Sequence, residues 1–158
     1  MSKYFIAFVV LFFLSSSLSA DEDAEQGLRI MTEVDLRDTG WVDYTVDLTM
    51  ILSNSRGETS ERQIRMKSKE TEGDGDRTLL VFDTPPDVRG TGLLTYTHFN
   101  GEDDQWLYLP ALKRIKRIAS KNKSGPFVGS EFAYEDLTSQ EVSKYSYKYL
   151  NDETIDGN

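Results

Sequence analysis

The sequence DDQWLYLPALKRIKRIASKNKSGPFVGSEFAYEDL, at residues 103–137, carries the clearest structural signals in this chain. It predicts a hairpin of two strands, 105–109 and 114–118, joined by a turn at Pro110. A long loop follows that is charged at first and then aromatic. Because long loops in compact domains are usually functional or disordered and aromatic residues disfavour disorder, we predict that this loop is a lid. Its closing residues would be Phe127, Phe132 and Tyr134.

Upstream of this hairpin, apolar and polar residues alternate along several segments. From Val42 to Leu52 every second residue is apolar, which predicts a long strand with one apolar face. Residues 77–83 include apolar residues on both faces, which is typical of a central strand. Turn-forming residues separate the segments, at 54–57 (Asn-Ser-Arg-Gly) after the first strand and at Asn100 and Gly101. Strands are therefore predicted at 41–53, 59–69, 77–83, 93–99, 105–109, 114–118 and 143–150.

One helix is predicted before the strands, at residues 22–37. Leu28, Met31 and Val34 recur near helical spacing, with charged residues on the opposite side. Gly40 lies close to the predicted end of the helix. The predicted order is one helix followed by about seven antiparallel strands, in a single domain that covers residues 21–158.

The first residues have the three parts of a secretory signal peptide. Lys3 supplies the positive charge, residues 4–14 form an apolar run, and small residues at 15–20 form a cleavage zone. The apolar run is too short to span a bilayer as a helix, which needs about 20 residues. We predict that residues 1–20 are removed after Ala20, or alternatively after Ser19. The mature protein would then be exported from the cytoplasm.

The composition argues against several classes of function. The chain contains no cysteine, which removes thiol nucleophiles, thiolate metal sites and redox chemistry. Its formal net charge of -9 argues against nucleic acid as a partner. The sequence contains no cofactor motif, and no group of His, Asp or Glu residues has the spacing of a zinc site. We therefore expect a protein that is not an enzyme and needs neither a cofactor nor a metal.

The single histidine and the acidic turns are weak candidates for chemistry. His98 is not accompanied by the Gly-x-Ser-x-Gly motif of a nucleophilic serine, so we interpret it as a partly buried, hydrogen-bonded histidine within a strand. Acidic residues gather at 72–76 and 102–104, but they lack the roughly twelve-residue ligand spacing of a calcium loop. We interpret them as solvated turn residues.

Nine apolar residues are predicted to line one surface of the sheet. Two interpretations are open: a filled core beneath the helix, or a partly vacant surface that binds a guest. Methionines and large aromatic residues suit adaptable binding surfaces. The residues of this predicted cavity are Val46, Leu48, Met50, Ile64, Met66, Leu94, Tyr96, Trp106 and Tyr108.

Six positive charges lie within eleven residues of this otherwise acidic chain. One interpretation is a solvent-facing strand whose charges aid solubility. The other is an electrostatic docking site for an anionic membrane surface, a lipid head group or an acidic partner protein. The six residues are Lys113, Arg114, Lys116, Arg117, Lys121 and Lys123.

Five short motifs in the chain are similar to those of a known family. They are PDVRGTGLLTY at 86–96, WLYLP at 106–110, RIKRI at 114–118, SGPF at 124–127 and FAYEDL at 132–137. Together they resemble the outer-membrane lipoprotein-sorting family, a LolA-like group of bacterial periplasmic proteins. The resemblance implies an α+β, mainly β fold: an unclosed antiparallel half-barrel with an N-terminal helix, which holds acyl chains beneath a lid made of loop and helix.

The resemblance also implies a function. We expect a periplasmic carrier that binds lipoprotein acyl chains, or another lipid, in the apolar cavity and delivers them toward the outer membrane. An inner-membrane transporter is the implied partner. The alternative is a non-enzymatic periplasmic interaction subunit that docks such a transporter through its basic face. Members of the family continue with further strands, and residues 156–158 look like the start of a hairpin turn, so we expect the sequence to be incomplete at its C-terminus.

Overall fold

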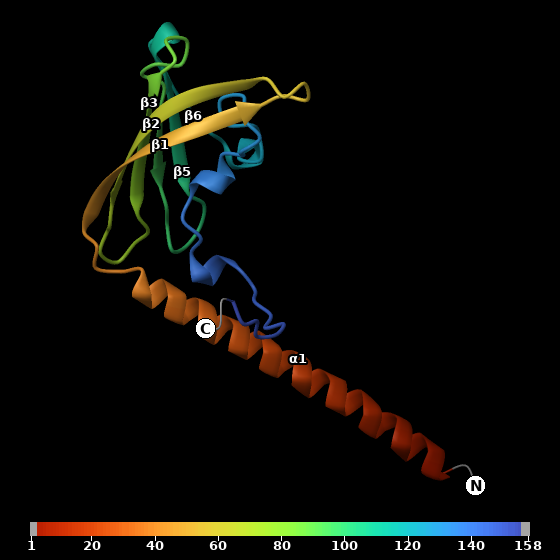
Figure 1. The fold of residues 1–158 in the computed structure, drawn as a ribbon. Helices are drawn as coiled ribbons and strands as arrows, with labels where there is room; N and C mark the ends of the chain where they lie inside the picture. The colour runs from red at the N-terminus through yellow and green to blue at the C-terminus, as the bar shows by residue number, and fades with distance from the viewer. Residues whose placement is uncertain (1–2, 156–158) are drawn as a thin grey trace. The chain divides into compact units, whose positions relative to one another are not determined.

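The computed structural model describes residues 3–155, with side chains from Ala20 onward. The chain forms two compact units. The first comprises the residues up to Asp38 together with those from Val142, and the second comprises Thr39–Glu141. The first unit contains the long helix α1, and the second contains the sheet (Figure 1).

The second unit is built on a six-stranded antiparallel sheet. Each strand pairs with the next one in the chain, so the sheet is a meander of order β1-β2-β3-β4-β5-β6. No further strand among the described residues pairs with β1 or β6, and the sheet is therefore unclosed, as expected. The strands are β1 (Asp43–Ser53), β2 (Thr59–Lys69), β3 (Arg77–Thr84), β4 (Gly92–Tyr96), β5 (Asp104–Leu109) and β6 (Arg114–Arg117), with a 3-10 turn η1 (Pro110–Leu112) between the last two.

The first six predicted strands are confirmed, although β4 ends at Tyr96 rather than at Phe99. The turn predicted after the first strand is also present. Asn54 Oδ1 accepts hydrogen bonds from the backbone N of Arg56 and of Glu58, at 2.9 and 3.0 Å. An asparagine side chain that bonds the backbone in this way stabilises a turn without help from the rest of the fold, which is why local sequence was sufficient to predict it.

Strand pairing assigns each side chain of the sheet to one of two faces. Successive residues of a strand point to opposite faces. Ile64 of β2 lies opposite Phe82 of β3, and these two side chains mark what we call the inner face. Leu79, Leu94 and Trp106 lie opposite one another in β3, β4 and β5 and mark the outer face.

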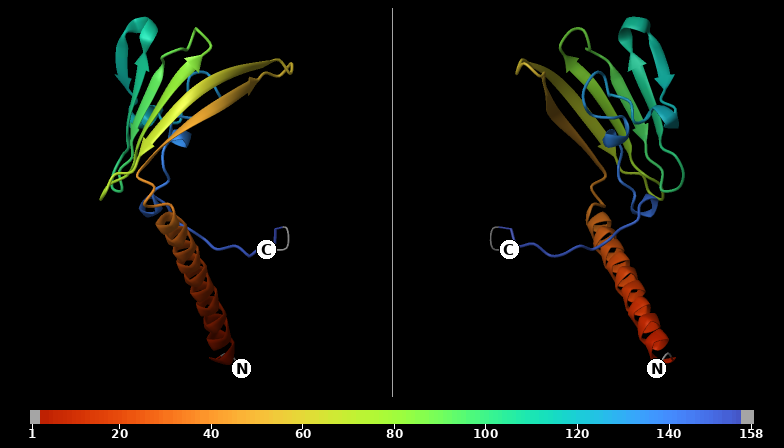
Figure 2. Two further views of the ribbon diagram at one scale, coloured as in Figure 1. Left: turned by 60° about the vertical axis from the view of Figure 1, so that its left-hand side comes forward. Right: turned by 90° about the vertical axis from the view of Figure 1, so that its right-hand side faces the viewer.

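The inner face is covered by residues 118–137, which we call the cover segment. It contains the 3-10 turns η2 (Ser120–Asn122) and η3 (Glu135–Leu137), and it lies against one side of the sheet (Figure 2). Phe127 is fully buried, with its ring centroid 5.6 Å from that of Phe82. The hydrophobic core, which lies between the inner face and the cover segment, consists of Ile64, Leu80, Phe82, Val88, Leu93 and Phe127.

Polar contacts also fix the cover segment to the sheet. Gln105 is fully buried on β5, and its Nε2 donates to the carbonyl O of Tyr134 at 2.8 Å. The backbone N of Ile118 donates to the carbonyl O of Gln105 at 2.9 Å. Lys123 Nζ lies 3.1 Å from Glu102 Oε2. The cover segment is therefore held at several points along its length and is an integral part of the fold.

Strands β1 and β2 extend past the end of β3. The pairing of β2 with β3 stops at Gln63, so residues 50–53 and 59–62 pair only with each other. We call this two-stranded hairpin, residues 50–62, the arm. It projects from the rest of the sheet in Figure 1.

Helix α1 spans Lys3–Arg37. It contains the predicted helix 22–37 and ends where predicted, but it begins much earlier, because the apolar run of the predicted signal segment continues the same helix. Residues 1 and 2 of that segment lie outside the described residues, and the cleavage of 1–20 stays a prediction. Nowhere in the described residues does a helix have the length and apolar character needed to cross a membrane.

The predicted strand at 143–150 is wrong. Residues Val142–Lys144 form a 3-10 turn, η4, and the following residues run beside α1 within the first unit. The backbone N of Tyr149 donates to the carbonyl O of Asp23 at 2.9 Å. Any extended segment has the strand's period of two, so alternating tyrosines do not distinguish a sheet partner from a segment packed on a helix. Residues 156–158, predicted to begin a hairpin turn, lie outside the described residues.

Gly27 permits this contact, because a Cβ at that position would lie 3.0 Å from the backbone N of both Lys148 and Tyr149. We predict that Gly27→Leu detaches the segment from α1 while strengthening the helix, since leucine is better than glycine in a helix by about 0.8 kcal/mol. Hydrogen exchange should become faster at the Tyr149 amide and no faster at the amides of α1. Unchanged protection of Tyr149 would contradict the prediction.

Candidate functional site

Strand pairing divides the predicted cavity residues between two faces. The prediction that all nine share one face is wrong, because Leu94 lies opposite Leu79, and Tyr96 opposite Arg77, on the outer face. Alternation within a strand does not fix how its faces match those of the next strand, and a shift by one residue exchanges them. Val46, Leu48, Met50, Ile64 and Met66 lie on the inner face, and Leu94, Tyr96, Trp106 and Tyr108 lie on the outer face.

Most of the inner face is occupied by the protein's own side chains. Ile64 and Phe82 are 4% and 1% exposed, and Phe127 of the cover segment is 0% exposed. The ring of Tyr134 packs edge-on against Phe127, with centroids 5.6 Å apart. Phe127 is thus a core residue rather than part of a movable lid. Tyr134 is half-buried, and Phe132 alone of the three predicted lid residues is largely exposed, at 52%.

The less covered part of the inner face lies on β1. Five apolar side chains follow one another there at alternate positions, and none of them is fully buried. Tyr44 and Val46 are 38% and 36% exposed. Because β1 is an edge strand, only β2 flanks this apolar strip. Its residues are Tyr44, Val46, Leu48, Met50 and Leu52.

A groove of about 640 Å³ lies between the arm and the part of the cover segment around Phe132. Small-molecule sites typically have volumes of about 300–1,000 Å³, so the groove is large enough for a guest. It continues the apolar strip of β1 at its Met50 end and is polar beyond it. Its apolar lining includes Met50, Leu52 and Phe132, and its polar lining includes Ser53, Asn54, Glu58, Thr59, Ser60, Ser130 and Glu131.

A closed loop at residues 127–132 forms one wall of the groove. The backbone N of Phe127 donates to the carbonyl O of Phe132 at 2.7 Å, and Ser130 Oγ donates to the carbonyl O of Phe127 at 2.8 Å. Val128 and Gly129 both have positive φ, 48° and 73°. A valine rarely adopts this conformation, and such strain gathers at functional sites. The loop keeps Phe127 in the core and Phe132 at the groove.

Arg62 joins the two walls of the groove and was not identified from the sequence. Its Nη1 donates to the carbonyl O of Val128 at 2.7 Å, and its guanidinium carbon lies 5.8 Å from the centroid of the Phe82 ring. The residue thereby ties the base of the arm to the 127–132 loop. The signal that could have revealed it is a charged side chain in the same alternating series as Ile64 and Met66.

The predicted basic docking set is also divided. Arg117 is ion-paired with Asp104. The residue Lys123 is only 8% exposed and lies against Glu102, so it belongs to the cover segment's attachment and not to a docking surface. The members that are exposed and have no carboxylate partner within the described part of the chain are Lys113, Arg114, Lys116 and Lys121.

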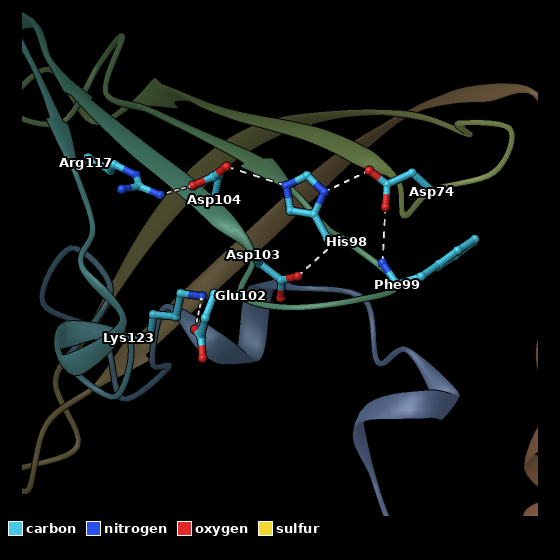
Figure 3. Close-up of polar contacts among 8 residues, drawn as sticks. All are labelled: Asp74, His98, Phe99, Glu102, Asp103, Asp104, Arg117 and Lys123. Atoms are coloured by element: carbon cyan, nitrogen blue, oxygen red, sulfur yellow. Dashed lines mark hydrogen bonds and ion pairs between the residues drawn. The ribbon is translucent and has the colours of Figure 1, made fainter.

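His98 lies in a polar cluster just beyond β4 (Figure 3). Its Nδ1 is 2.8 Å from Asp74 Oδ2, and its Nε2 is 3.5 Å from Asp104 Oδ2. Its backbone N donates to Asp103 Oδ1 at 3.0 Å. The hydrogen-bonded, partly buried histidine is confirmed, but it lies in the connection after the strand rather than within it. Within the described residues, no group of three or more His, Asp or Glu side chains has the arrangement of a metal site.

The cluster shifts the ionisation of its members. The hydrogen bond to Asp74 raises the pKa of His98 above its ordinary value. The same bond holds the pKa of Asp74 below its usual value. For Asp104 the pKa is also lowered, chiefly by the Arg117 guanidinium. His98, which lies between the carboxylates of Asp74 and Asp104, therefore links the turn at 72–76 to the connection between β4 and β5.

We predict that this link makes stability depend on pH. Because the pKa of His98 is raised in the folded protein, its contribution is fully present below the ordinary value of 6.5 and is lost as the pH rises through the raised pKa. His98→Gln should therefore be less stable than the wild type below pH 6.5, with the difference shrinking at higher pH. Denaturant titrations below and above that pH measure this difference in the free energy of unfolding. A difference that does not change with pH would contradict the prediction.

The contrast between the two phenylalanines gives a second prediction. Phe127→Ala should lower the free energy of unfolding by about 3–5 kcal/mol, because it empties a fully buried aromatic site. Phe132→Ala removes a half-exposed ring and should cost less than about 1 kcal/mol. Denaturant unfolding of both variants tests the assignment, and equal costs would show that Phe127 is not the core residue described above.

The fold matches two solved structures. A "putative outer membrane lipoprotein-sorting protein domain" from Vibrio parahaemolyticus is 57% identical, with a TM-score of 0.81 over 85% of this chain and 57% of that chain. A DUF1329 family protein from Desulfovibrio piger is 29% identical, with a TM-score of 0.78 over the same shares. The chain thus spans 57% of the length of each of these structures.

A family model described as "uncharacterized protein" matches residues 74–158, which are 85 of the 158 residues. No curated protein matches the chain. The matched region begins at Asp74 of the His98 cluster and includes β3, β4, β5, β6 and the whole cover segment. With this match, the 57% identity and the shared unclosed antiparallel sheet, the chain belongs to the LolA-like family of outer-membrane lipoprotein-sorting proteins.

Proposed function

We propose that this protein is a periplasmic carrier that binds the acyl chain of a lipoprotein or another lipid and delivers it toward the outer membrane. The observation that carries the proposal is the incompletely covered apolar strip of β1, which leads into the 640 Å³ groove beside the arm. The family of the Vibrio domain agrees with this function. The acyl chain would lie along the strip and enter the groove, rather than fill the space already taken by Phe127.

The energetics of this site suit a transient carrier. Each methylene removed from water is worth about 0.8 kcal/mol, so about eight methylenes would gain roughly 6 kcal/mol. The gain is diminished by the cost of ordering the chain and the side chains that receive it. A carrier must also release its cargo, and a groove that is open to solvent imposes little barrier to release. Glu58 and Glu131 at the groove's polar end would remain hydrated.

Exposed cations favour a second candidate function. Lys113, Arg114, Lys116 and Lys121 have no carboxylate partner among the described residues. They suit docking of an acidic partner, such as an inner-membrane transporter, without any cargo in the groove. This non-enzymatic interaction subunit would depend on charge, so its binding would weaken steeply with salt.

The test of the carrier is a titration of the full chain with a fatty acid that carries a fluorescent group. Val46→Glu and Met50→Glu should each weaken binding by at least about tenfold, because a carboxylate beside an acyl chain costs more than roughly 1.4 kcal/mol. Thr49→Glu is the matched control. It introduces the same charge into the same strand, but on the exposed outer face.

Circular dichroism and thermal unfolding should show that the three variants remain folded. Absence of saturable binding by the wild type would contradict the carrier function. Equal affinity of Met50→Glu and Thr49→Glu for the fatty acid would show that the groove is not part of the binding site. Binding to a transporter that is lost at high salt, and that is unaffected by Val46→Glu, would instead favour the interaction subunit.

A further inference from the structure

The outer face carries an apolar patch that the proposed groove does not use. Six apolar side chains from β3, β4, β5 and β6 surround Gly92, and together they enclose a shallow dip of about 240 Å³. Three of them are well exposed: Leu79 at 38%, Tyr108 at 41% and Ile115 at 70%. The six are Leu79, Val81, Leu94, Trp106, Tyr108 and Ile115.

The dip exists because Gly92 has no side chain. In the sheet, Gly92 lies between Val81 of β3 and Tyr108 of β5, so two larger side chains flank an empty position. A Cβ at Gly92 would meet only the carbonyl O of Leu80, at 3.5 Å, which is an ordinary contact. Gly92 is also not among the glycines with positive φ. Neither crowding nor backbone conformation therefore explains a glycine here.

One wall of the dip is held rigid by aromatic contacts. The rings of Tyr96 and Trp106 pack edge-to-face with centroids 5.3 Å apart. Arg77 lies over the Tyr96 ring, with its guanidinium carbon 4.7 Å from the centroid. Rigid aromatic side chains with an arginine beside them are typical of the residues that dominate binding energy at protein interfaces.

Positive charge borders the patch although the chain is acidic overall. Lys67 lies directly opposite Leu79, and Lys69 lies directly opposite Arg77. Like charges in opposite positions of neighbouring strands destabilise a sheet, and these three cations have no carboxylate partner among the described residues. By contrast, Arg65 on the same face is paired with Asp83.

On the other side of β2, Asp43 of β1 lies directly opposite Lys69. Lys67 and Arg77 have no acidic residue directly opposite them in either neighbouring strand. They are therefore the cations whose charge the carboxylates of a partner would compensate.

We propose that the outer face binds an acidic segment of a partner protein, which inserts one bulky apolar side chain into the dip over Gly92. The segment would be acidic because its carboxylates would pair with the cations beside the patch. It would insert a single apolar side chain because the dip has room for little more. A lipid bilayer would match the charge but would not need a hollow the size of one or two side chains. The inference is independent of the carrier function, because the groove is on the inner face.

The experiment is a selection of short random peptides displayed on phage, carried out against the full chain and against Gly92→Leu. The variant fills the dip with a side chain that the backbone tolerates. Selection on the wild type should enrich peptides with one bulky apolar residue flanked by Asp and Glu. Enriched peptides should bind Gly92→Leu at least about tenfold more weakly, as expected for loss of an interface anchor. Thr49→Leu, which adds an apolar residue on the outer face outside the patch, should bind them normally.

Charge is tested with the double variant Lys67→Glu, Lys69→Glu, which should also bind the peptides at least about tenfold more weakly. Lys148→Glu, at an exposed residue of the first unit and not of the sheet, serves as the control. Failure to enrich acidic peptides, or equal binding by Gly92→Leu, overturns the proposal. Two further results would overturn the proposal if Gly92→Leu abolishes them. Co-sedimentation of the protein with vesicles of phosphatidylcholine and phosphatidylglycerol would identify a bilayer as the occupant of the dip. Self-association of the protein would identify a second copy of the chain as the occupant.

Discussion

The packing of the Phe127 ring between Phe82 and Tyr134 determines how much of the inner face remains open. With that ring in place, residues 118–137 extend over the inner face and their side chains complete the core. The chain then turns outward through two residues with positive φ, so that Phe132 lies beside the arm. One buried ring thus sets both the filled part of the domain and the boundary of the groove. The function proposed for the protein depends on what this packing leaves uncovered.

The two faces of the sheet differ in electrostatic character as well as in shape. The groove on the inner face has Glu58 and Glu131 at its polar end, whereas the dip on the outer face is bordered by cations such as Lys67. An apolar guest can occupy the groove while an acidic protein segment occupies the dip, because neither ligand competes for the other's contacts. Since alternate residues of a strand point to opposite faces, a single layer of strands is sufficient to present both surfaces.

Local signals in the sequence were sufficient for the strands and turns, because alternation and turn residues such as Asn54 act over a few positions. They did not place Leu94 and Trp106 on the correct face, since the match between the faces of two strands depends on how the connection between them is formed. They also did not separate the tyrosines of 143–150 from a true strand. The burial of Phe127 could not be predicted either, because it depends on contacts with Phe82, 45 positions away in the sequence.

The two-stranded construction of the arm has a mechanical consequence. A hairpin without a third strand is only marginally stable by itself, so we expect the arm to deform more easily than the strands that have two neighbours. The hydrogen bond from Arg62 to the Val128 carbonyl holds the base of the arm against the 127–132 loop, so any deformation is expected beyond that residue. Because the arm forms one wall of the groove, we expect such deformation to change the width of the space beside Phe132. We therefore expect the groove to accept cargo molecules of different widths through deformation of the arm.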